Sequence, residues 1–598
     1  MTQSHVFVIM GDITHLKCDA WMLPSDSDYV VGKQWTDSVA GLTEALARTR
    51  DAKYSAGSKF ALPVRGWEPS SPLPILTAVP LNGFQNADDL RPRIDEFIRV
   101  GAEQAGTLRN PTEGARPNLL LAMPSFATAG GGGRLLKGEI LQVILEQARE
   151  TARDVGVDVV IVLRDKRMFA LAQVMRKAPE HWSELAERGL LDEAQELAEI
   201  AKTGRLVPFM GAGVSVSAGA PTWAELIRSL ADGANLEPDE EAGLLHGGLD
   251  ALDQAAYLRS RYAGAGRLKA RDTPRQPALS FNEEIATRVD LARYGLAPAL
   301  LAGLRTEQAI TMNYDLLFET ASADIGDERT VIPDSTVNGE KWLLKLHGSV
   351  KNPESIVLTR DDYLGYSTSR EALSAVVKAT LITHHLLFVG FGLKDDHFHE
   401  IIHDVRRAMP QNAEVGDSLA TALTLANDPL HAAVWEGKLK LVPMSQKSDS
   451  GGISASARTL EVFLDALLAF STDSHSYLLS EEYEHALSGP EKELRQDLLQ
   501  FYWLRKEDEL QSEPWKVIAQ ALRDLGLDSD DEITQTQAIC PMCGRFTGIR
   551  IMYGMPGFDA MERAGRGEIA LGGCIVEDDM PQWSCTNTDC KCEWGRES

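Results

Sequence analysis

Short apolar runs of strand length alternate with helical patterns along the first part of the chain. Four of these runs predict buried strands: Val6–Met10, Cys18–Leu23, Asn118–Met123 and Val157–Leu163. Apolar positions at helical spacing predict one helix around Ile140–Ala148 and another from about Met168 to Lys177. Strands alternating with helices favour an α/β domain with a parallel or mixed sheet covered by helices on both faces.

A second alternation begins at Leu206–Met210, which enters the turn Gly211-Ala212-Gly213 and then Ser215. A helix follows, because Thr222 with Glu225 three residues later forms a capping-box pattern. Glycines in such a turn let the backbone approach a diphosphate, and the free N–H groups and helix dipole favour an anion. Taken alone, the turn fits a tight connection equally well.

Three later apolar runs also end in small or polar residues. They end at Thr311-Met312-Asn313-Tyr314-Asp315, at His347-Gly348-Ser349 and at Gly390-Phe391-Gly392. The carboxyl ends of strands in an open parallel sheet line one crevice. We therefore expect these motifs and the Gly211 turn to meet at one place.

These four motifs, in this order, resemble the sirtuin superfamily, in particular its branch in bacterial antiphage defence proteins, over about residues 203–470. The resemblance implies a Rossmann-like parallel sheet and NAD⁺ as the bound substrate. Asn313 would hold the nicotinamide ribose and an attacking water, and His347 would act as general base. Cleavage of the N-glycosidic bond needs a placed nucleophile, a base with a pKa near neutrality and a desolvated pocket. The implied NAD⁺-binding residues are Gly211, Ala212, Gly213, Ser215, Thr311, Asn313, Asp315, Gly390 and Gly392.

Two departures from the deacetylases of that superfamily bear on the reaction. The chain has no cysteine between Cys18 and Cys540, so their four-cysteine zinc module is missing, and Thr222-Trp223-Ala224 replaces their aspartate-phenylalanine-arginine run. We therefore expect an NAD⁺ glycohydrolase that releases nicotinamide and ADP-ribose. The alternatives are a protein deacylase or ADP-ribosyltransferase, which needs an acceptor, and a non-enzymatic scaffold that binds NAD⁺ or ADP-ribose for a partner ATPase.

The N-terminal motif Gly11-Asp12-Ile13-Thr14, with the aspartate-alanine pair and short strand that follow, resembles the opening of a macro domain. The resemblance implies a ligand loop in which Asp12, beside Ile13, meets an adenine amino group and Gly130, Gly131, Gly132 and Gly133 surround the diphosphate of ADP-ribose. Leu23-Pro24-Ser25-Asp26 replaces the asparagine-rich segment of that family, which argues against hydrolase chemistry here. The alternative is a degenerate macro fold kept for packing or assembly.

The cysteines are concentrated near the C-terminal end, with six of the seven between Cys540 and Cys592. This tail resembles a small zinc ribbon, whose metal stabilises a domain with little core. Cys540, Cys543, Cys585 and Cys590 are the expected ligands of a closed, structural Zn²⁺ site, and Cys592 competes with Cys590 for the fourth place.

Bulk composition sets the remaining expectations. The chain has 598 residues, 44% hydrophobic residues and a formal net charge of −27, which predicts several domains and disfavours nucleic acid as a partner. No segment has the roughly 18 uninterrupted apolar residues of a membrane span, and the first residues lack a signal-peptide pattern. We expect a cytoplasmic protein that does not engage a membrane.

We predict five parts: a macro-like domain (1–178), a helical connector (179–204), a sirtuin-like catalytic domain with a helical insertion (205–474), a helical linker or assembly segment (475–535) and the zinc ribbon (536–598). The resemblance further implies a defence role through NAD⁺ depletion. Unregulated depletion would kill the host, so we expect gated activity, a homo-oligomer and an activator or partner ATPase.

Overall fold

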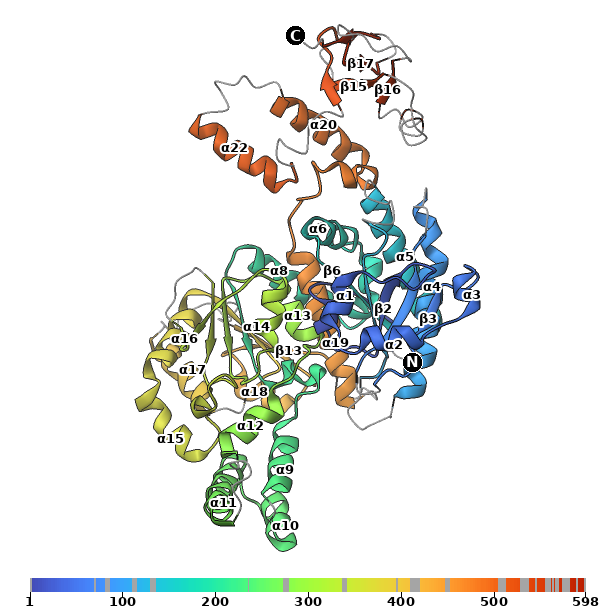
Figure 1. The fold of residues 1–598 in the computed structure, drawn as a ribbon. Coiled ribbons are helices and arrows are strands. Elements are labelled where there is room, and N and C mark those ends of the chain that lie inside the picture. Colours follow the sequence, from blue (N-terminus) through green and yellow to red (C-terminus); the bar gives the residue numbers. More distant parts are fainter. Residues whose placement is uncertain are drawn as a thin grey trace. The chain divides into compact units, whose positions relative to one another are not determined.

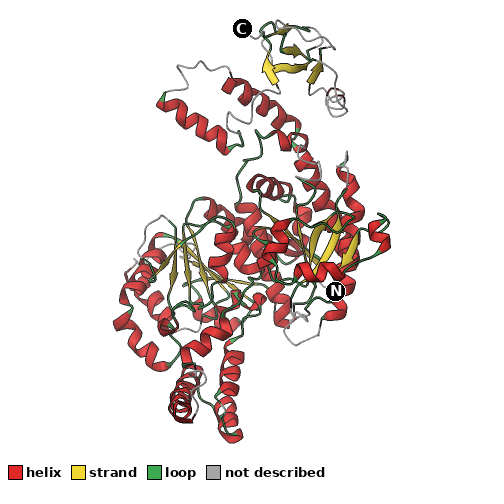
Figure 2. Cartoon of the chain, in the orientation of Figure 1, coloured by secondary structure: helices red, strands yellow, loops and turns green. Residues whose placement is uncertain are grey.

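The structure is a computed structural model of the full chain. It describes residues 3–595 except 69–70, 81–85, 110–115, 129–135, 235, 273–278, 336–340, 394–395, 409–419, 447–451, 504–511, 528–536, 544–545, 554–560, 562–563, 565–568, 573–580 and 588–589. The chain forms two compact units, residues 1–133 with 140–473, and residues 134–139 with 474–598. The predicted α/β class is confirmed: the first unit holds two mainly parallel sheets flanked by helices (Figures 1 and 2).

The N-terminal sheet has six strands in the order β1-β6-β5-β2-β4-β3, of which only β3 runs antiparallel to its neighbour. Its apolar runs become strands because they are buried on both faces, as the burial of every residue in β1 and β6 shows. The strands are β1 (Val6–Met10), β2 (Ala20–Ser25), β3 (Ala61–Pro63), β4 (Leu73–Ala78), β5 (Leu120–Pro124) and β6 (Asp158–Leu163). Its helices are α1 (Lys33–Ser38), α2 (Leu42–Arg48), α3 (Ala52–Ser55), α4 (Arg91–Leu108), α5 (Lys137–Val155) and α6 (Lys166–Met175).

The central sheet has seven strands in the order β13-β12-β11-β7-β8-β10-β9, all paired in parallel. All the strands therefore end at one edge, as the sequence predicts for its glycine, asparagine and histidine motifs. The strands are β7 (Leu206–Met210), β8 (Gln308–Thr311), β9 (Thr330–Ile332), β10 (Trp342–Lys345), β11 (His385–Val389), β12 (Ala420–Thr424) and β13 (Lys440–Pro443).

Four helices between β7 and β8 form the expected helical insertion: α9 (Trp223–Gly233), α10 (Pro238–His246), α11 (Ala251–Asp272) and α12 (Phe281–Val289). The insertion has its own apolar core, in which Leu230 of α9 packs with Leu258 and Ile285. The Thr222–Glu225 capping box that the sequence predicts is present at the start of α9. The other helices of this part are α13 (Leu296–Gly303), α14 (Leu317–Asp324), α15 (Arg360–Ser369), α16 (Glu371–Thr383), α17 (Asp396–Ala408) and α18 (Pro429–Trp435).

Helix α19 (Gly452–Ser471) joins the two sheets of the first unit. It contacts α13, β1 and α6. It also contacts α8 (Leu191–Lys202), which follows α6 and the short helix α7 (Ser183–Glu187). Its buried side carries charged residues that meet partners from the N-terminal sheet. Arg458 of α19 donates to Asp158 at the start of β6 over 2.8 and 2.9 Å, and both side chains are fully buried.

The same interface contains further buried ions. Arg116 bonds to Asp158 over 2.7 Å and also to Glu461 of α19, while Arg176 at the end of α6 binds Asp465. Replacing one member of such a cluster leaves uncompensated buried charge, which typically costs about 3–5 kcal/mol. The cluster therefore makes the N-terminal sheet and α19 parts of one folding unit.

Asp158 predicts a specific dependence of stability on pH. Despite its burial, Arg116 and Arg458 hold the pKa of this carboxyl low, at about 2, whereas an unfolded aspartate titrates near 3.9. The resulting stabilisation, about 2.6 kcal/mol, is complete above about pH 5 and is lost as the pH falls through about 2. Urea unfolding at a series of pH values should show this loss in wild type. Asp158→Asn should be less stable at pH 7, and its free energy of unfolding should fall less steeply with decreasing pH. An unchanged pH dependence in this variant would contradict the assignment.

The second unit contains α20 (Gly489–Trp503), α22 (Glu513–Asp524) and a small sheet of β14 (Gln537–Ile539), β15 (Phe546–Met552), β16 (Ile569–Leu571), β17 (Trp583–Cys585) and β18 (Glu593–Trp594). Residues 134–139 belong to this unit, and Lys137 pairs with Glu482 over 2.7 Å. The hairpin β14–β15 and the pair β17–β18 are antiparallel, which places two turns close together at the cysteine pairs.

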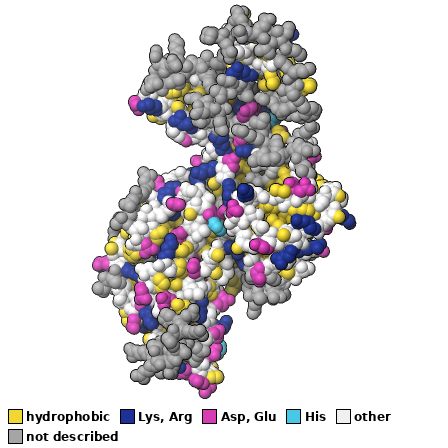
Figure 3. Space-filling view, in the orientation of Figure 1, with side chains coloured by type: hydrophobic (Ala, Val, Ile, Leu, Met, Phe, Trp, Pro, Cys, Tyr) yellow, Lys and Arg dark blue, Asp and Glu magenta, His cyan; other side chains and the backbone are white. Residues whose placement is uncertain are grey.

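Among the helices that the structure describes, none is long and apolar enough to cross a membrane. On the face seen in Figure 3, the described lysines and arginines are interspersed with aspartates and glutamates. That mixture gives nucleic acid no continuous basic surface on this face.

Candidate functional site

The glycine turn after β7 packs directly against the loop after β11. Gly211 N donates to Val389 O over 2.9 Å, and Gly213 N donates to Gly390 O over 2.9 Å. A Cβ on Gly213 would lie 2.7 Å from the Gly390 Cα, and a Cβ on Gly211 would lie 2.6 Å from the Gly390 O. Gly390 itself has a φ of +64°, a conformation that favours glycine. These three glycines are therefore required by the close approach of two backbones.

This close approach predicts opposite outcomes for two neighbouring substitutions. Gly213→Ala forces a methyl into the Gly390 backbone, which we expect to cost about 1–3 kcal/mol. A Cβ in Gly392→Ala meets no atom of the described residues within 4 Å, so the melting temperature should stay within about one degree of wild type. Differential scanning calorimetry of both variants provides the comparison, and equal melting temperatures would show that the two loops are not in contact.

A hydrogen-bonded network joins the β7 turn to the end of β8. The Asn313 Nδ2 donates to Gly211 O over 3.1 Å and to the Ser215 Oγ over 3.0 Å, and the Ser215 Oγ donates to the Asp315 Oδ2 over 2.7 Å. Ser215 and Asp315 are buried. The Asn313 Oδ1 is also buried, yet it has no hydrogen-bond partner in the described part of the chain. An acceptor held in this way is suited to receive a hydrogen bond from a bound ligand.

Thr311 and Asp315 also support the turn itself. The Thr311 hydroxyl accepts from Asn313 N over 3.0 Å and donates to Met210 O over 3.3 Å. The Asp315 Oδ1 accepts from Leu317 N over 3.1 Å at the beginning of α14. Both side chains thus hold the backbone that carries Asn313.

His347 follows β10 and is buried, with 5% of its surface exposed. Its ring lies edge-on to Tyr363 and Tyr366 of α15, with centroid distances of 5.5 and 5.9 Å. Thr311 of β8 pairs with Lys345 of β10, so Asn313 and His347 each lie two residues beyond paired positions on neighbouring strands. The structure therefore brings the β7 turn, Asn313, Asp315 and the Gly390 loop together, with His347 at the next strand end.

A cavity of about 440 Å³ opens beside these strand ends. It lies next to α14, β9 and the loop after β10, and β8 and β10 separate β9 from the strand that enters the Gly211 turn. Its lining consists of Leu316, Glu319, Arg329, Thr330, Val331, Asp334, Ser335, Ser349 and Lys351.

The predicted macro-like loop is only partly described, since Gly130, Gly131, Gly132 and Gly133 lie outside the described residues. The Asp12 carboxylate accepts from Thr14 N over 2.9 Å and also binds Arg164. The Asp12 N donates to the Tyr294 hydroxyl over 3.1 Å, and that hydroxyl donates to Asp324 over 2.9 Å. Tyr294 thus covers the Gly11–Asp12 turn.

Sequence reasoning missed Tyr294, which lies 282 residues from Asp12. It pairs with Leu16 in an isolated β-bridge, and the following Gly295 lies so close to Ser217 that a Cβ would be 2.1 Å from the Ser217 Oγ. No local pattern marks it, because a tyrosine between two helices is unremarkable until the fold brings the N-terminal turn to it.

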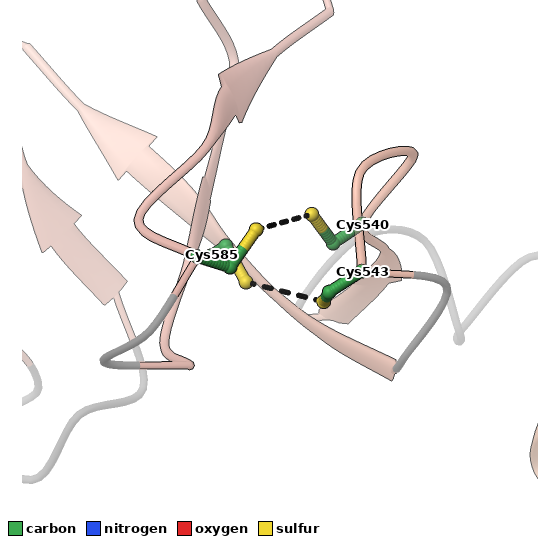
Figure 4. A group of neighbouring side chains, drawn as sticks. Cys540, Cys543 and Cys585 are labelled. Atoms are coloured by element: carbon green, nitrogen blue, oxygen red, sulfur yellow. Dashed lines mark hydrogen bonds between the residues drawn. The ribbon is translucent and has the colours of Figure 1, made fainter.

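The cysteines form the cluster that their spacing predicts. The sulfurs of Cys540, Cys543, Cys585 and Cys590 all lie within 4.8 Å of one another, with Cys540–Cys590 at 3.5 Å and Cys543–Cys585 at 3.8 Å. Figure 4 shows Cys540, Cys543 and Cys585 of this group. Sulfurs bound at about 2.3 Å to a tetrahedral Zn²⁺ are about 3.8 Å apart, so the group fits that ion. The Cys592 sulfur instead contacts Glu593 O. Cys574 lies outside the described residues.

Comparison with known proteins defines the class of the central sheet. Residues 307–440, which include Asn313, His347 and Gly390, match the SIR2-like domain. The predicted sirtuin-like nature of this segment is confirmed.

Curated relatives match about a third of the chain. The NAD(+) hydrolase ThsA of Enterococcus faecium is 27% identical over 226 residues, which is 36% of this chain and 43% of the relative. The NAD(+) hydrolase ThsA of Bacillus cereus is 30% identical over 33% of this chain and 40% of the relative. Defense-associated sirtuin 2 of Bacillus subtilis is 26% identical over 37% of this chain and 21% of the relative. The chain thus spans less than half the length of these relatives.

A macrodomain of Oceanobacillus iheyensis, solved with ADP, matches 31% of this chain and 94% of its own length, at 18% identity and a TM-score of 0.23. Such a low TM-score carries no argument about the ligand. The macro-like interpretation therefore rests on the Gly11–Thr14 motif and the described sheet.

Proposed function

We propose that the protein is an NAD⁺ hydrolase that cleaves the bond between nicotinamide and ribose. The observation that carries the proposal is the buried Asn313 Oδ1 beside the Gly211 turn, an acceptor to which no described residue donates. The Asn313 amide is fixed by Gly211 O and Ser215, so this oxygen is aimed before a substrate arrives. The similarity to NAD(+) hydrolases supports the choice of substrate.

The proposed roles follow from the placement of the groups. The turn Gly211-Ala212-Gly213, with Ser215, Gly390 and Gly392 near it, receives the diphosphate, because glycines without side chains let a backbone approach it closely. Thr311 and Asp315 keep Asn313 in place. Asn313 accepts from a ribose hydroxyl or from the attacking water, and His347 takes the proton that the water loses as it adds to the ribose carbon.

Nicotinamide release from NAD⁺ by the purified full chain tests this proposal. Quantification of nicotinamide and ADP-ribose should give equal amounts without any protein acceptor, with candidate nucleotides added as activators. His347→Ala should reduce the rate by about 10²-fold or more, as expected for loss of a general base. His403→Ala is the matched control, because 65% of that side chain is exposed.

Other results would identify the rival functions. Turnover that requires a peptide or protein acceptor would indicate a deacylase or ADP-ribosyltransferase. NAD⁺ binding without nicotinamide release under any condition would indicate a scaffold, for example for a partner ATPase. Equal release by wild type and His347→Ala would remove His347 from the mechanism.

For the N-terminal domain (1–178) we propose binding of an ADP-ribose-like nucleotide at Asp12 and Ile13, with Gly130–Gly133 around its diphosphate. Tyr294 holds the Asp12 N, so such a ligand has to displace its hydroxyl to use that donor. Calorimetry on the full-length Asn313→Ala protein, with and without Asp12→Ala, separates this site from the sirtuin-like one. If neither protein binds ADP-ribose or a cyclic variant, the domain serves assembly instead.

We propose that 179–204 is a helical connector, 205–474 the catalytic domain, 475–535 an assembly segment and 536–598 a zinc ribbon with structural Zn²⁺. The similarity to Defense-associated sirtuin 2 supports a role in antiviral defence through gated NAD⁺ depletion. We place the protein in the cytoplasm as a homo-oligomer that acts with an activator or partner ATPase, which size-exclusion chromatography with light scattering and co-purification would test.

A further inference from the structure

Strand β10 buries a lysine in an otherwise apolar run. Lys345 exposes 1% of its surface, whereas Leu343 and Leu344 before it are ordinary apolar core. Its Nζ donates to Asp315 O over 2.5 Å and to the Glu319 Oε1 of α14 over 2.7 Å. These two bonds connect β10 to the turn after β8 and to the helix that follows that turn.

Stability alone does not account for this pair. Removing an ammonium and a carboxylate from water costs several kcal/mol per ion, and well-packed apolar side chains at both positions are often as stable or more stable. Burial raises the pKa of Glu319 in spite of the neighbouring Lys345. The ion pair therefore costs free energy of folding. Apolar residues at the two positions would not reproduce the hydrogen bond from Lys345 to Asp315 O.

That bond acts on the residues of the proposed active site through a short chain of contacts. Lys345 holds the Asp315 backbone, the Asp315 carboxylate receives the Ser215 hydroxyl over 2.7 Å, and Ser215 receives the Asn313 amide over 3.0 Å. Lys345 is the last residue of β10 and lies two residues before His347. One side chain thus ties the backbone that carries Asn313 to the strand that leads to His347.

We propose that Lys345, supported by Glu319, is a positioning residue that holds the Asn313–Asp315 turn in the geometry needed for NAD⁺ cleavage. This inference rests on the proposed hydrolase function. Lys345 acts through the placement of the backbone, so substitution of Lys345 should lower kcat far more than it changes the KM for NAD⁺. A displacement of about 1 Å in a reacting group can cost about 10²-fold in rate.

A single and a double substitution separate positioning from stability. Lys345→Met leaves Glu319 buried without its partner, so both the melting temperature and kcat should fall. Lys345→Met with Glu319→Met removes both ions, so the melting temperature should recover. We expect kcat of the double variant to stay about 10- to 100-fold below wild type. Recovery of kcat together with the melting temperature would overturn the proposal.

Asp327→Asn provides the matched control. Asp327 is also buried and pairs with Arg329 over 2.9 Å. It precedes β9, at the edge where the strands begin, whereas Asn313 and His347 lie at the edge where the strands end. Its loss should lower the melting temperature and leave the kcat of the folded protein unchanged. Turnover by wild type and by this control tests the hydrolase proposal separately from the role of Lys345.

A second measurement does not require turnover. Hydrogen–deuterium exchange should be faster in peptides covering residues 312–317 of the double variant than in wild type, since the turn loses a donor that fixes Asp315. Exchange in the β12 and β13 peptides should not change. Equal exchange in residues 312–317 would contradict the positioning role, even if no activator of the enzyme were found.

Discussion

Substitution of Asn313 by alanine is expected to lower nicotinamide release from NAD⁺ by about 10²–10³-fold while the protein stays folded. The amide of Asn313 is held by Gly211 O and the Ser215 Oγ, which leaves the buried Oδ1 as the only acceptor of that side chain for a ligand. Groups fixed in advance beside a reacting centre contribute typically about 2.7–4 kcal/mol to catalysis, and their removal lowers kcat by the corresponding factor.

Asn313→Asp refines the same test. The carboxylate keeps an acceptor in place but loses the two N–H bonds, and it adds a charge beside Asp315. We expect it to be less stable than Asn313→Ala and equally impaired. Asn427→Ala is a suitable control, because the Asn427 side chain bonds to Gln446 at the surface. Nicotinamide release by Asn313→Ala at the wild-type rate would show that the acceptor is not used.

Loss of the metal is expected to unfold the C-terminal sheet, the largest effect predicted on structure. The binding energy of structural zinc in comparable small domains is about 10–16 kcal/mol, and it is folding energy because no preformed site exists without the metal. In the part of this domain that is described, β17 and β18 contribute only five strand residues, and the stacked pair Trp583–Trp594 is one of its few apolar contacts. We expect one zinc per chain by elemental analysis, and none after Cys540→Ser.

The fourth ligand can be assigned in the same experiment. Cys590→Ser should release the zinc and expose residues 537–595 to hydrogen exchange, whereas Cys592→Ser should keep both the zinc and the protection. The reason is that the Cys590 sulfur lies in the cluster, while the Cys592 sulfur is directed toward Glu593 O. The reverse result would move the site to Cys592.

The strand-end motifs illustrate what a sequence predicts well. Gly211, Asn313, His347 and Gly390 each follow a buried apolar run, and a parallel sheet places all such ends at one edge whatever the connecting lengths. The cysteine pairs are a second example, because two hairpins that carry thiolates at their turns bind one tetrahedral metal ion when the two turns meet. In both places local pattern and global fold specify the same geometry.

The sequence patterns do not predict the contacts of three residues, Tyr294, Lys345 and Arg458. Each acts on a residue far away in sequence, through contacts that arise only when separate elements pack together. Lys345 stands in an apolar run and simply weakens the strand pattern, and Arg458 lies in a helix whose apolar face dominates. Their partners follow from tertiary packing, which periodicity does not encode.

The bond between Arg458 and Asp158 spans 300 residues, and this separation has a consequence for biosynthesis. Ribosomes add about 5–20 residues per second, so Arg458 is synthesised roughly 15–60 seconds after Asp158. During that interval Asp158 has Arg116 as a partner but lacks Arg458, and the sheet that leads to Asn313 and His347 lacks the helix that packs against α13. The first unit is therefore complete only after α19 has left the ribosome, and the proposed NAD⁺ hydrolase site is expected to reach its final packing no earlier than that.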